Sequence, residues 1–143
     1  MKRAREQVVR DFVHEWMQKA EADLKAAEHL LQLEQEDYFT VAFHAQQAAE
    51  KFLKALLVRH QIPFPKTHDI QRLLELLDSI DATIKRELAS AAILTDFGVE
   101  FRYPAEEVAD LTTARRAITE AKRVREAVLG RLRAYLSRGG LAK

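Results

Sequence analysis

The sequence predicts an all-α protein, an up-and-down antiparallel bundle of about five helices, three long and two short. Strong helix formers (Ala, Leu, Glu, Lys, Arg and Gln) dominate the composition, and only four Gly and three Pro are present to form turns. Apolar residues also recur every three or four positions over long stretches. With 143 residues, the chain is long enough for one hydrophobic core. We therefore expect one domain over residues 1–143, with an ordered core at about 8–137.

Two long apolar stripes predict the first two long helices. The first covers residues 8–33 and consists of Val9, Val13, Trp16, Ala20, Leu24, Ala27 and Leu31. The second, over residues 38–60, is rich in alanine, which lets a neighbouring helix approach closely. Asp37 is its expected N-cap, and Pro63 and Pro65 prevent it from continuing.

Two short helices are expected in the middle of the chain. Thr67 is the expected N-cap of the first, with Asp69 in its first turn, and its buried side is Ile70, Leu73, Leu74 and Leu77. The second begins after Asp81 and ends near Phe97, with Ile84, Leu88 and Ala91 facing the core.

The last long helix is expected to begin with Pro104 at its first position, because proline suits that position, and to end near Leu136 before Gly139 and Gly140. Its predicted inner side is Val108, Leu111, Ile118, Ala121, Val128 and Leu132.

Several kinds of site are excluded by composition. The chain has no cysteine, so disulfides, thiolate metal sites and cysteine nucleophiles are ruled out. Residues 14–18 begin like a zinc-binding helix, but Gln18 stands where the second histidine is needed, and we expect no metal and no cofactor. No apolar run approaches the roughly 20 residues of a membrane span, and no secretory signal is visible at the N-terminus. These observations predict a cytoplasmic protein without membrane contact.

The charge is unevenly distributed along the chain. Residues 111–143 hold nine Lys and Arg against Glu120 and Glu126, although the whole chain has a net charge of only +1. One interpretation is a solvated, arginine-rich helix face. The other is a contact surface for phosphate-bearing partners or for an acidic protein.

A polar stripe follows the second predicted helix. His44, Gln47, Lys51 and Lys54 are spaced by three or four positions, so they share one helix face, and Glu50 is placed to pair with Lys54. This face is either exposed to solvent, or it lines a groove whose donors and cations suit the phosphate of a nucleotide or RNA.

A second candidate site lies just before the predicted last helix. Arg102 and Tyr103 would place a guanidinium and a phenol beside the N-terminal N–H groups of that helix, an arrangement that binds anions. A structural arginine that caps neighbouring carbonyls is the alternative. His68 and Asp69, at the start of the third helix, are possible accessory residues or local capping residues.

These motifs together resemble a known family. The run from Ala42 to Leu57, the Trp16–Ala27 region before it, the residues 66–70 (Lys-Thr-His-Asp-Ile) and the residues 101–104 (Phe-Arg-Tyr-Pro) are similar to the signature of HEPN domains. The name stands for "higher eukaryotes and prokaryotes nucleotide-binding". The resemblance extends over about residues 10–135.

The resemblance implies a helical bundle that commonly forms a homodimer and is often encoded beside a minimal nucleotidyltransferase, its partner. Many family members are metal-independent endoribonucleases, including toxins of toxin–antitoxin pairs, whose motif is an Arg followed a few residues later by a His. Arg102 resembles that Arg, but Glu107, Val108 and Ala109 stand where the His is expected, and no His follows His68.

Three functions remain open from the sequence. The leading hypothesis is a non-catalytic HEPN domain that binds nucleotide or nucleic-acid phosphate and pairs with a minimal nucleotidyltransferase. Arg102 and Tyr103 would bind the phosphate at a dimer groove, with Lys51, Lys54, His44 and Gln47 along its wall. The second hypothesis is a divergent endoribonuclease toxin in which His44 or His68 transfers the proton. The third is a purely structural dimerisation module.

Overall fold

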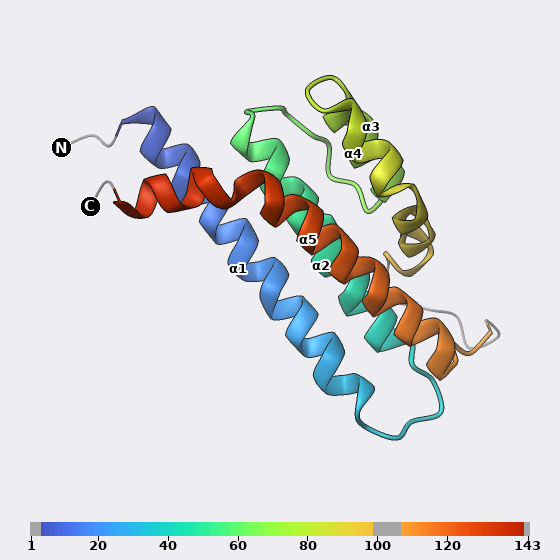
Figure 1. Ribbon diagram of the computed structural model, residues 1–143. Helices are drawn as coiled ribbons and strands as arrows, with labels where there is room; N and C mark the ends of the chain where they lie inside the picture. The colour runs from blue at the N-terminus through green and yellow to red at the C-terminus, as the bar shows by residue number, and fades with distance from the viewer. Residues whose placement is uncertain (1–3, 99–106, 142–143) are drawn as a thin grey trace.

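The computed structural model describes residues 4–98 and 107–141 of the chain. Its elements in chain order are α1 (Arg5–Leu31), α2 (Phe39–Arg59), α3 (Ile70–Asp78), α4 (Ala82–Glu87), the 3₁₀ helix η1 (Ala89–Phe97) and α5 (Leu111–Leu141). Among the described residues every regular element is a helix. In Figure 1, α1 runs antiparallel to α2 and α5. The short helices α3, α4 and η1 return the chain from the end of α2 toward the start of α5. The predicted all-α bundle is confirmed.

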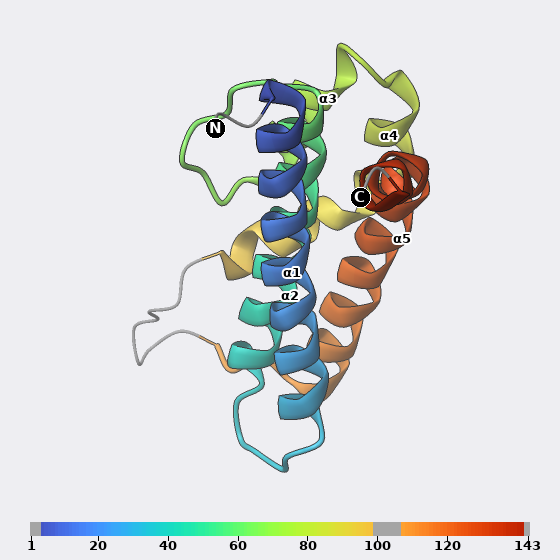
Figure 2. The same cartoon turned by 90° about the vertical axis from the view of Figure 1, so that its left-hand side faces the viewer.

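Helix α2 lies at the centre of the bundle, because α1 and α5 both pack against it (Figure 2). Its alanines are fully buried, and the side chain of each is a single methyl group. The backbones therefore approach closely, and larger residues fill the remaining space. The main ones are Phe52, Leu53, Leu56, Leu57, Leu73, Leu74, Leu77, Leu88 and Leu132.

The predicted start of the last helix was wrong. Residues 107–110 are not helical, and α5 begins at Leu111 with Asp110 accepting a hydrogen bond from the Thr113 N–H at 2.7 Å. The backbone of Ala109 is bound to another segment: its carbonyl accepts from the Tyr38 N–H, and its N–H donates to Asp37. Because those groups are occupied, the helix does not extend backwards through Ala109.

Two further details of this helix differ from prediction. Val108, expected in the core, is 60% exposed because it precedes the helix. The helix also passes Leu136 and the glycine pair and ends at Leu141, since glycine weakens a helix but does not block it. The proposed first residue, Pro104, lies outside the described residues.

The caps of the shorter helices follow a common pattern. The carboxylate of Asp69, rather than the hydroxyl of Thr67, caps α3 by accepting from the Arg72 N–H, because Asp69 directly precedes the helix. The helix α4 begins after Asp81, as predicted, and Asp81 caps it by accepting from the Thr83 N–H. Before α2, Asp37 accepts a hydrogen bond from the Phe39 N–H at 2.9 Å, although Tyr38 occupies the N-cap position.

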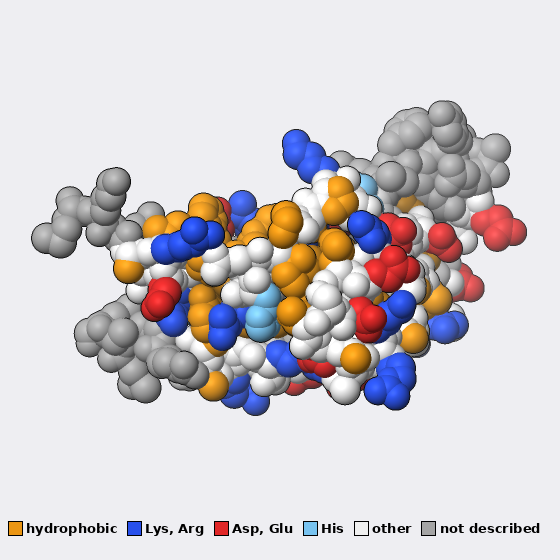
Figure 3. Space-filling view, turned by 90° about the horizontal axis from the view of Figure 1, so that it is seen from above, with side chains coloured by type: hydrophobic (Ala, Val, Ile, Leu, Met, Phe, Trp, Pro, Cys, Tyr) orange, Lys and Arg blue, Asp and Glu red, His pale blue; other side chains and the backbone are white. Residues whose placement is uncertain are grey.

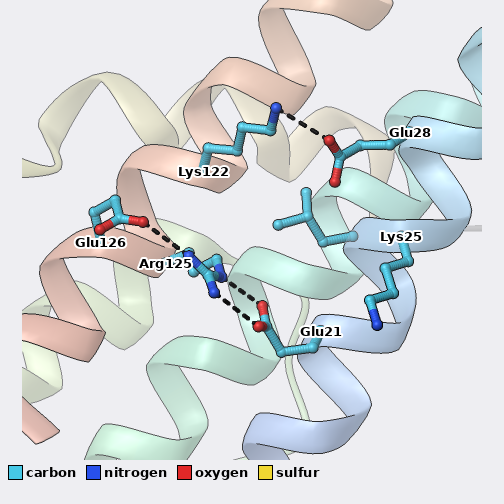
Figure 4. A pocket seen from close by; sticks show the side chains of 7 residues that line it. Glu21, Lys25, Glu28, Lys122, Arg125 and Glu126 are labelled. Carbon is cyan, nitrogen blue, oxygen red and sulfur yellow. Dashed lines mark hydrogen bonds and ion pairs between the residues drawn. The ribbon is translucent and has the colours of Figure 1, made fainter. Parts of the chain in front are cut away.

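Much of the basic charge of α5 is neutralised by acidic residues of other helices. Figure 4 shows Arg125 in a bidentate contact with Glu21 of α1, at 2.6 and 2.9 Å, and Lys122 paired with Glu28 at 3.1 Å. Arg131 pairs with Asp81 at 2.5 Å. Most of the charged residues that line the pocket between α1 and α5 in Figure 4 are thus paired with one another.

Candidate functional site

Asp23 of α1 joins two residues of the predicted polar stripe. His44 Nδ1 lies 3.0 Å from Asp23 Oδ1, and the Lys51 ammonium donates to the other carboxylate oxygen. All three side chains are partly buried. The carboxylate fixes the orientation of the imidazole and leaves His44 Nε2 as the ring nitrogen available to a ligand.

Glu50 of α2 is the centre of a second, more deeply buried group, which we call the Glu50 cluster: Gln46, Glu50, Lys54 and His68. Glu50 is 4% exposed and accepts three hydrogen bonds or ion pairs, from Lys54 at 2.7 Å, His68 Nδ1 at 2.8 Å and Gln46 at 3.1 Å. Burial raises the pKa of Glu50, but the hydrogen bonds from Lys54, His68 and Gln46 outweigh it and hold that pKa below its usual value. Glu50 is therefore a carboxylate at neutral pH.

His68 is the exposed member of this cluster. Its side chain is 54% exposed although its partner Glu50 is almost completely buried. Because an ionised carboxylate accepts at Nδ1, that nitrogen carries the proton and Nε2 is left as the second functional atom. Nε2 can accept a proton, or donate to an anion once the ring is protonated.

Lys54 is enclosed rather than free. Its ammonium lies 5.6 Å from the ring centroid of Trp16 and 5.5 Å from that of Phe64, and the two rings meet edge to face. The side chain of Lys54 is buried, with the aromatic rings on one side and Glu50 on the other. Lys54 therefore holds Glu50 in its ionised state from inside the fold.

The described residues on either side of positions 99–106 contact α2 near its start and the loop that follows α2. A Cβ on Gly98 would come within 2.6 Å of His68 Cβ, so the backbone there passes directly against the histidine. Phe97 packs edge to face on Phe39, and Ala109, beyond the segment, is bonded to Tyr38 and Asp37. The predicted phosphate-binding residues Arg102 and Tyr103 lie outside the described residues.

The structure divides the remaining predicted site residues between two groups. Gln47 donates to Gln46 Oε1 at 2.8 Å and so joins the Glu50 cluster, whereas His44 and Lys51 belong to the Asp23 group. Asp69 is occupied as the α3 cap.

Sequence reasoning missed Asp23 and the role of Trp16 as a cover for Lys54. One signal was available for Asp23: it follows Trp16 by seven positions, two helical turns, which places both on the same face.

Within residues 4–98 and 107–141, no three His, Asp or Glu side chains are grouped closely enough to hold a metal ion. None of the helices that the structure describes has the length and apolar character that crossing a membrane requires.

The fold and these clusters define a helical bundle with a polar, histidine-bearing face on its second helix. The chain matches the family model of the HEPN domain over residues 13–132. Because this match covers most of the chain, the protein belongs to the HEPN family. Comparisons with curated proteins and with solved structures gave no match. Membership in the HEPN family implies a function related to nucleotides or RNA.

Proposed function

We propose that this HEPN protein binds the phosphate of a nucleotide or an RNA without cleaving it, and that it is the cytoplasmic partner of a minimal nucleotidyltransferase. In this proposal His68 and Arg102 contact the phosphate, with Tyr103 beside them. The support from the described residues is the contact between Gly98 and His68, because the chain enters the segment that contains Arg102 directly beside the exposed histidine.

The observation that carries the proposal is the pairing of His68 with buried Glu50. A histidine whose Nδ1 is held by a carboxylate presents Nε2 in a fixed direction, so little side-chain freedom is lost when a ligand binds. His44 is held by Asp23 in the same way.

The other residues of the polar stripe have supporting roles in this proposal. Lys51 is partly exposed and adds positive potential, although Asp23 offsets much of it. Gln47 and Lys54 fix the cluster from which His68 projects, and Asp69 caps α3 one residue later. Arg102 is then the main positive charge that contacts the phosphate.

A second candidate function is a metal-independent endoribonuclease, as in the toxin of a toxin–antitoxin pair. One observation favours it: a buried carboxylate behind an exposed imidazole is the arrangement that orients a general base. His68 would then transfer the proton while Arg102 stabilises the phosphate. We rank this function second because the expected His after Arg102 is missing from the sequence.

We also propose that the protein is a homodimer. Four large apolar side chains are well exposed in the described monomer, namely Phe12, Leu33, Ile80 and Val108. Figure 3 shows hydrophobic side chains reaching the surface in the middle of one face, among basic side chains and a histidine. A purely structural dimerisation module is the remaining alternative, and it predicts no ligand.

The proposal is tested by calorimetric titration with a nucleotide panel and short RNAs. We expect Arg102→Ala and His68→Ala each to lower affinity roughly tenfold to a hundredfold, the loss of one charge-assisted hydrogen bond. The matched control is Arg86→Gln, which removes one charge from an exposed position on α4. It should leave affinity unchanged.

The same samples separate the three functions. Binding without RNA cleavage supports the proposal, whereas cleavage that is lost in His68→Ala identifies the endoribonuclease. No binding by the folded wild-type protein contradicts both and leaves the structural module. Circular dichroism of each variant shows whether a loss of binding is a loss of fold.

A further inference from the structure

One end of the bundle holds a pocket that shares no residue with the Glu50 cluster or the Asp23 group. It has a volume of about 530 Å³ and lies where the start of α1, the end of α2 and the last turns of α5 meet. Both chain termini lie at this end in Figure 1. The lining residues are Arg5, Glu6, Val9, Arg10, Arg59 and Tyr135, with Gln61 at the edge.

The charge in this pocket is mainly positive. Three arginines face one glutamate, and no ion pair joins any of them to a carboxylate within the described part of the chain. In Figure 3 basic side chains appear at this end of the molecule, and acidic side chains gather at the opposite end. Burial lowers the pKa of the neighbouring His60, and the charge of Arg59 lowers it further, against a smaller opposing effect of Asp81.

Two of the arginines contact the ring of Tyr135. The guanidinium carbon of Arg59 lies 4.1 Å from the ring centroid, and that of Arg10 lies 4.6 Å from it. Each contact is favourable by itself, but two cations beside one ring repel each other. A bound anion would remove that repulsion.

Arg10 also has an unsatisfied donor. Its Nε is buried and has no hydrogen-bond partner among the described residues, and a buried donor without a partner costs about 1–3 kcal/mol. Other arginines at helix contacts here are satisfied differently: Arg125 is bidentate to Glu21, and Arg131 is bound to Asp81. The missing acceptor at Arg10 is what an external oxyanion would provide.

We propose that this pocket binds a small phosphate-bearing molecule, with Arg10 and Arg59 holding the phosphate and Arg5 at the mouth. Guanidinium groups bind phosphate oxygens in a bidentate, planar arrangement, and those of Arg10 and Arg59 are already oriented by the tyrosine. The volume exceeds the needs of a phosphate ion and falls in the range of pockets for drug-sized ligands, so a molecule of nucleotide size fits. This site is independent of the proposed function at His68.

The test is calorimetric titration of the full chain with ATP, AMP, pyrophosphate, inorganic phosphate, adenosine and a short RNA. We expect the small phosphate compounds to bind and adenosine not to bind. Arg10→Gln/Arg59→Gln should lower their affinity at least tenfold. The His68→Ala variant should retain a binding event for these compounds that Arg10→Gln/Arg59→Gln weakens, which separates this pocket from the site of the proposed function.

The control is Arg86→Gln/Arg133→Gln, which removes the same charge from two exposed positions that do not line the pocket. It should change affinity less than about twofold if the effect is specific. In case the pocket variant does not fold, the imidazole resonance of His60 in the wild-type protein gives a second readout and should shift on binding.

Three results would overturn the inference. The first is that no small phosphate compound binds the wild-type protein. The second is binding that the two pocket substitutions leave unchanged, or that occurs while the His60 resonance stays in place. The third is that RNA alone binds through these arginines, which would make the pocket part of a nucleic-acid surface.

Discussion

Gly98 lies where the end of η1 passes His68 more closely than a side chain allows. Because the Cβ of an alanine would lie 2.6 Å from His68 Cβ, Gly98→Ala should force these segments apart and lower the free energy of unfolding by about 1–3 kcal/mol. Gly130, in the middle of α5, has no atom within 4 Å of an added Cβ. Gly130→Ala should therefore stabilise the protein by about 0.5–1 kcal/mol.

Urea denaturation of both variants measures the free energy of unfolding, which should fall in Gly98→Ala and rise in Gly130→Ala. A Gly98→Ala variant as stable as the wild type would show that His68 moves aside freely and is not held against the backbone.

Glu50 and Lys54 form a buried ion pair in which each residue is the counterion of the other. Glu50→Gln should lower the free energy of unfolding by about 3–5 kcal/mol, because it leaves the ammonium of Lys54 buried without a counterion. Glu50→Gln/Lys54→Met should recover most of that loss, since methionine fits between Trp16 and Phe64. Chemical denaturation of the two single variants and the double variant gives the coupling energy.

A coupling energy near zero would contradict a stabilising ion pair between Glu50 and Lys54.

The stabilisation by Glu50 also depends on pH. The pKa of Glu50 is lowered in the fold, so its contribution to the free energy of unfolding is present above the pKa of the unfolded chain and is lost as the pH falls through the folded pKa.

The residues of the site were predictable where spacing along one helix determines them. The pair of Glu50 with Lys54 follows from a separation of four positions, and the shared face of His44 and Lys51 follows from helical geometry. The partners from other helices were not predictable in this way. The contact of His68 with Glu50 depends on how the loop after α2 returns across that helix, and helical spacing carries no information about it.

Among the elements, α4 is held to α5 by Asp81 and Arg131. The hydrogen bonds from Arg131 and then Thr83 lower the pKa of Asp81 from 3.8 to about 2. The stabilisation is therefore present above about pH 4 and is lost between about pH 4 and 2. Asp81→Asn keeps an N-cap residue but removes the charge, and should cost about 1 kcal/mol at neutral pH.

Thermal unfolding at pH 7 and at pH 2 checks this prediction. The two proteins should differ at pH 7, and most of that difference should be lost at pH 2. A constant difference at both values would show that Asp81 acts through its cap hydrogen bonds and not through its charge.

The positions of the long helices were predictable, but the start of α5 was not. Apolar periodicity placed α1, α2 and the body of α5 correctly, because burial of one face decides those residues. Pro104 and the acidic residues after it gave a local start signal. That signal is overridden by the hydrogen bond from the Tyr38 N–H to the Ala109 carbonyl and by the one from the Ala109 N–H to Asp37, more than 70 positions earlier in the chain. Local propensity cannot predict such a long-range contact.

For the whole molecule, we predict a homodimer. The prediction rests on the exposed side chains of Phe12 and Val108, whereas Phe97 is partly covered by Phe39. Light scattering at micromolar concentration should give twice the monomer mass of 16.4 kDa. The monomer mass over the whole concentration range would contradict the dimer.

The central claim is that His68 contacts a bound phosphate, and proton NMR of the histidine side chains tests it most directly. The chain has five histidines, and the spectrum of His68→Ala identifies the His68 resonance. On titration with a nucleotide or short RNA that binds, the His68 resonance should shift in proportion to saturation, while those of His14 and His29 on α1 stay in place. A His68 resonance that remains unchanged while calorimetry shows the ligand bound to the Arg10→Gln/Arg59→Gln variant would contradict the account.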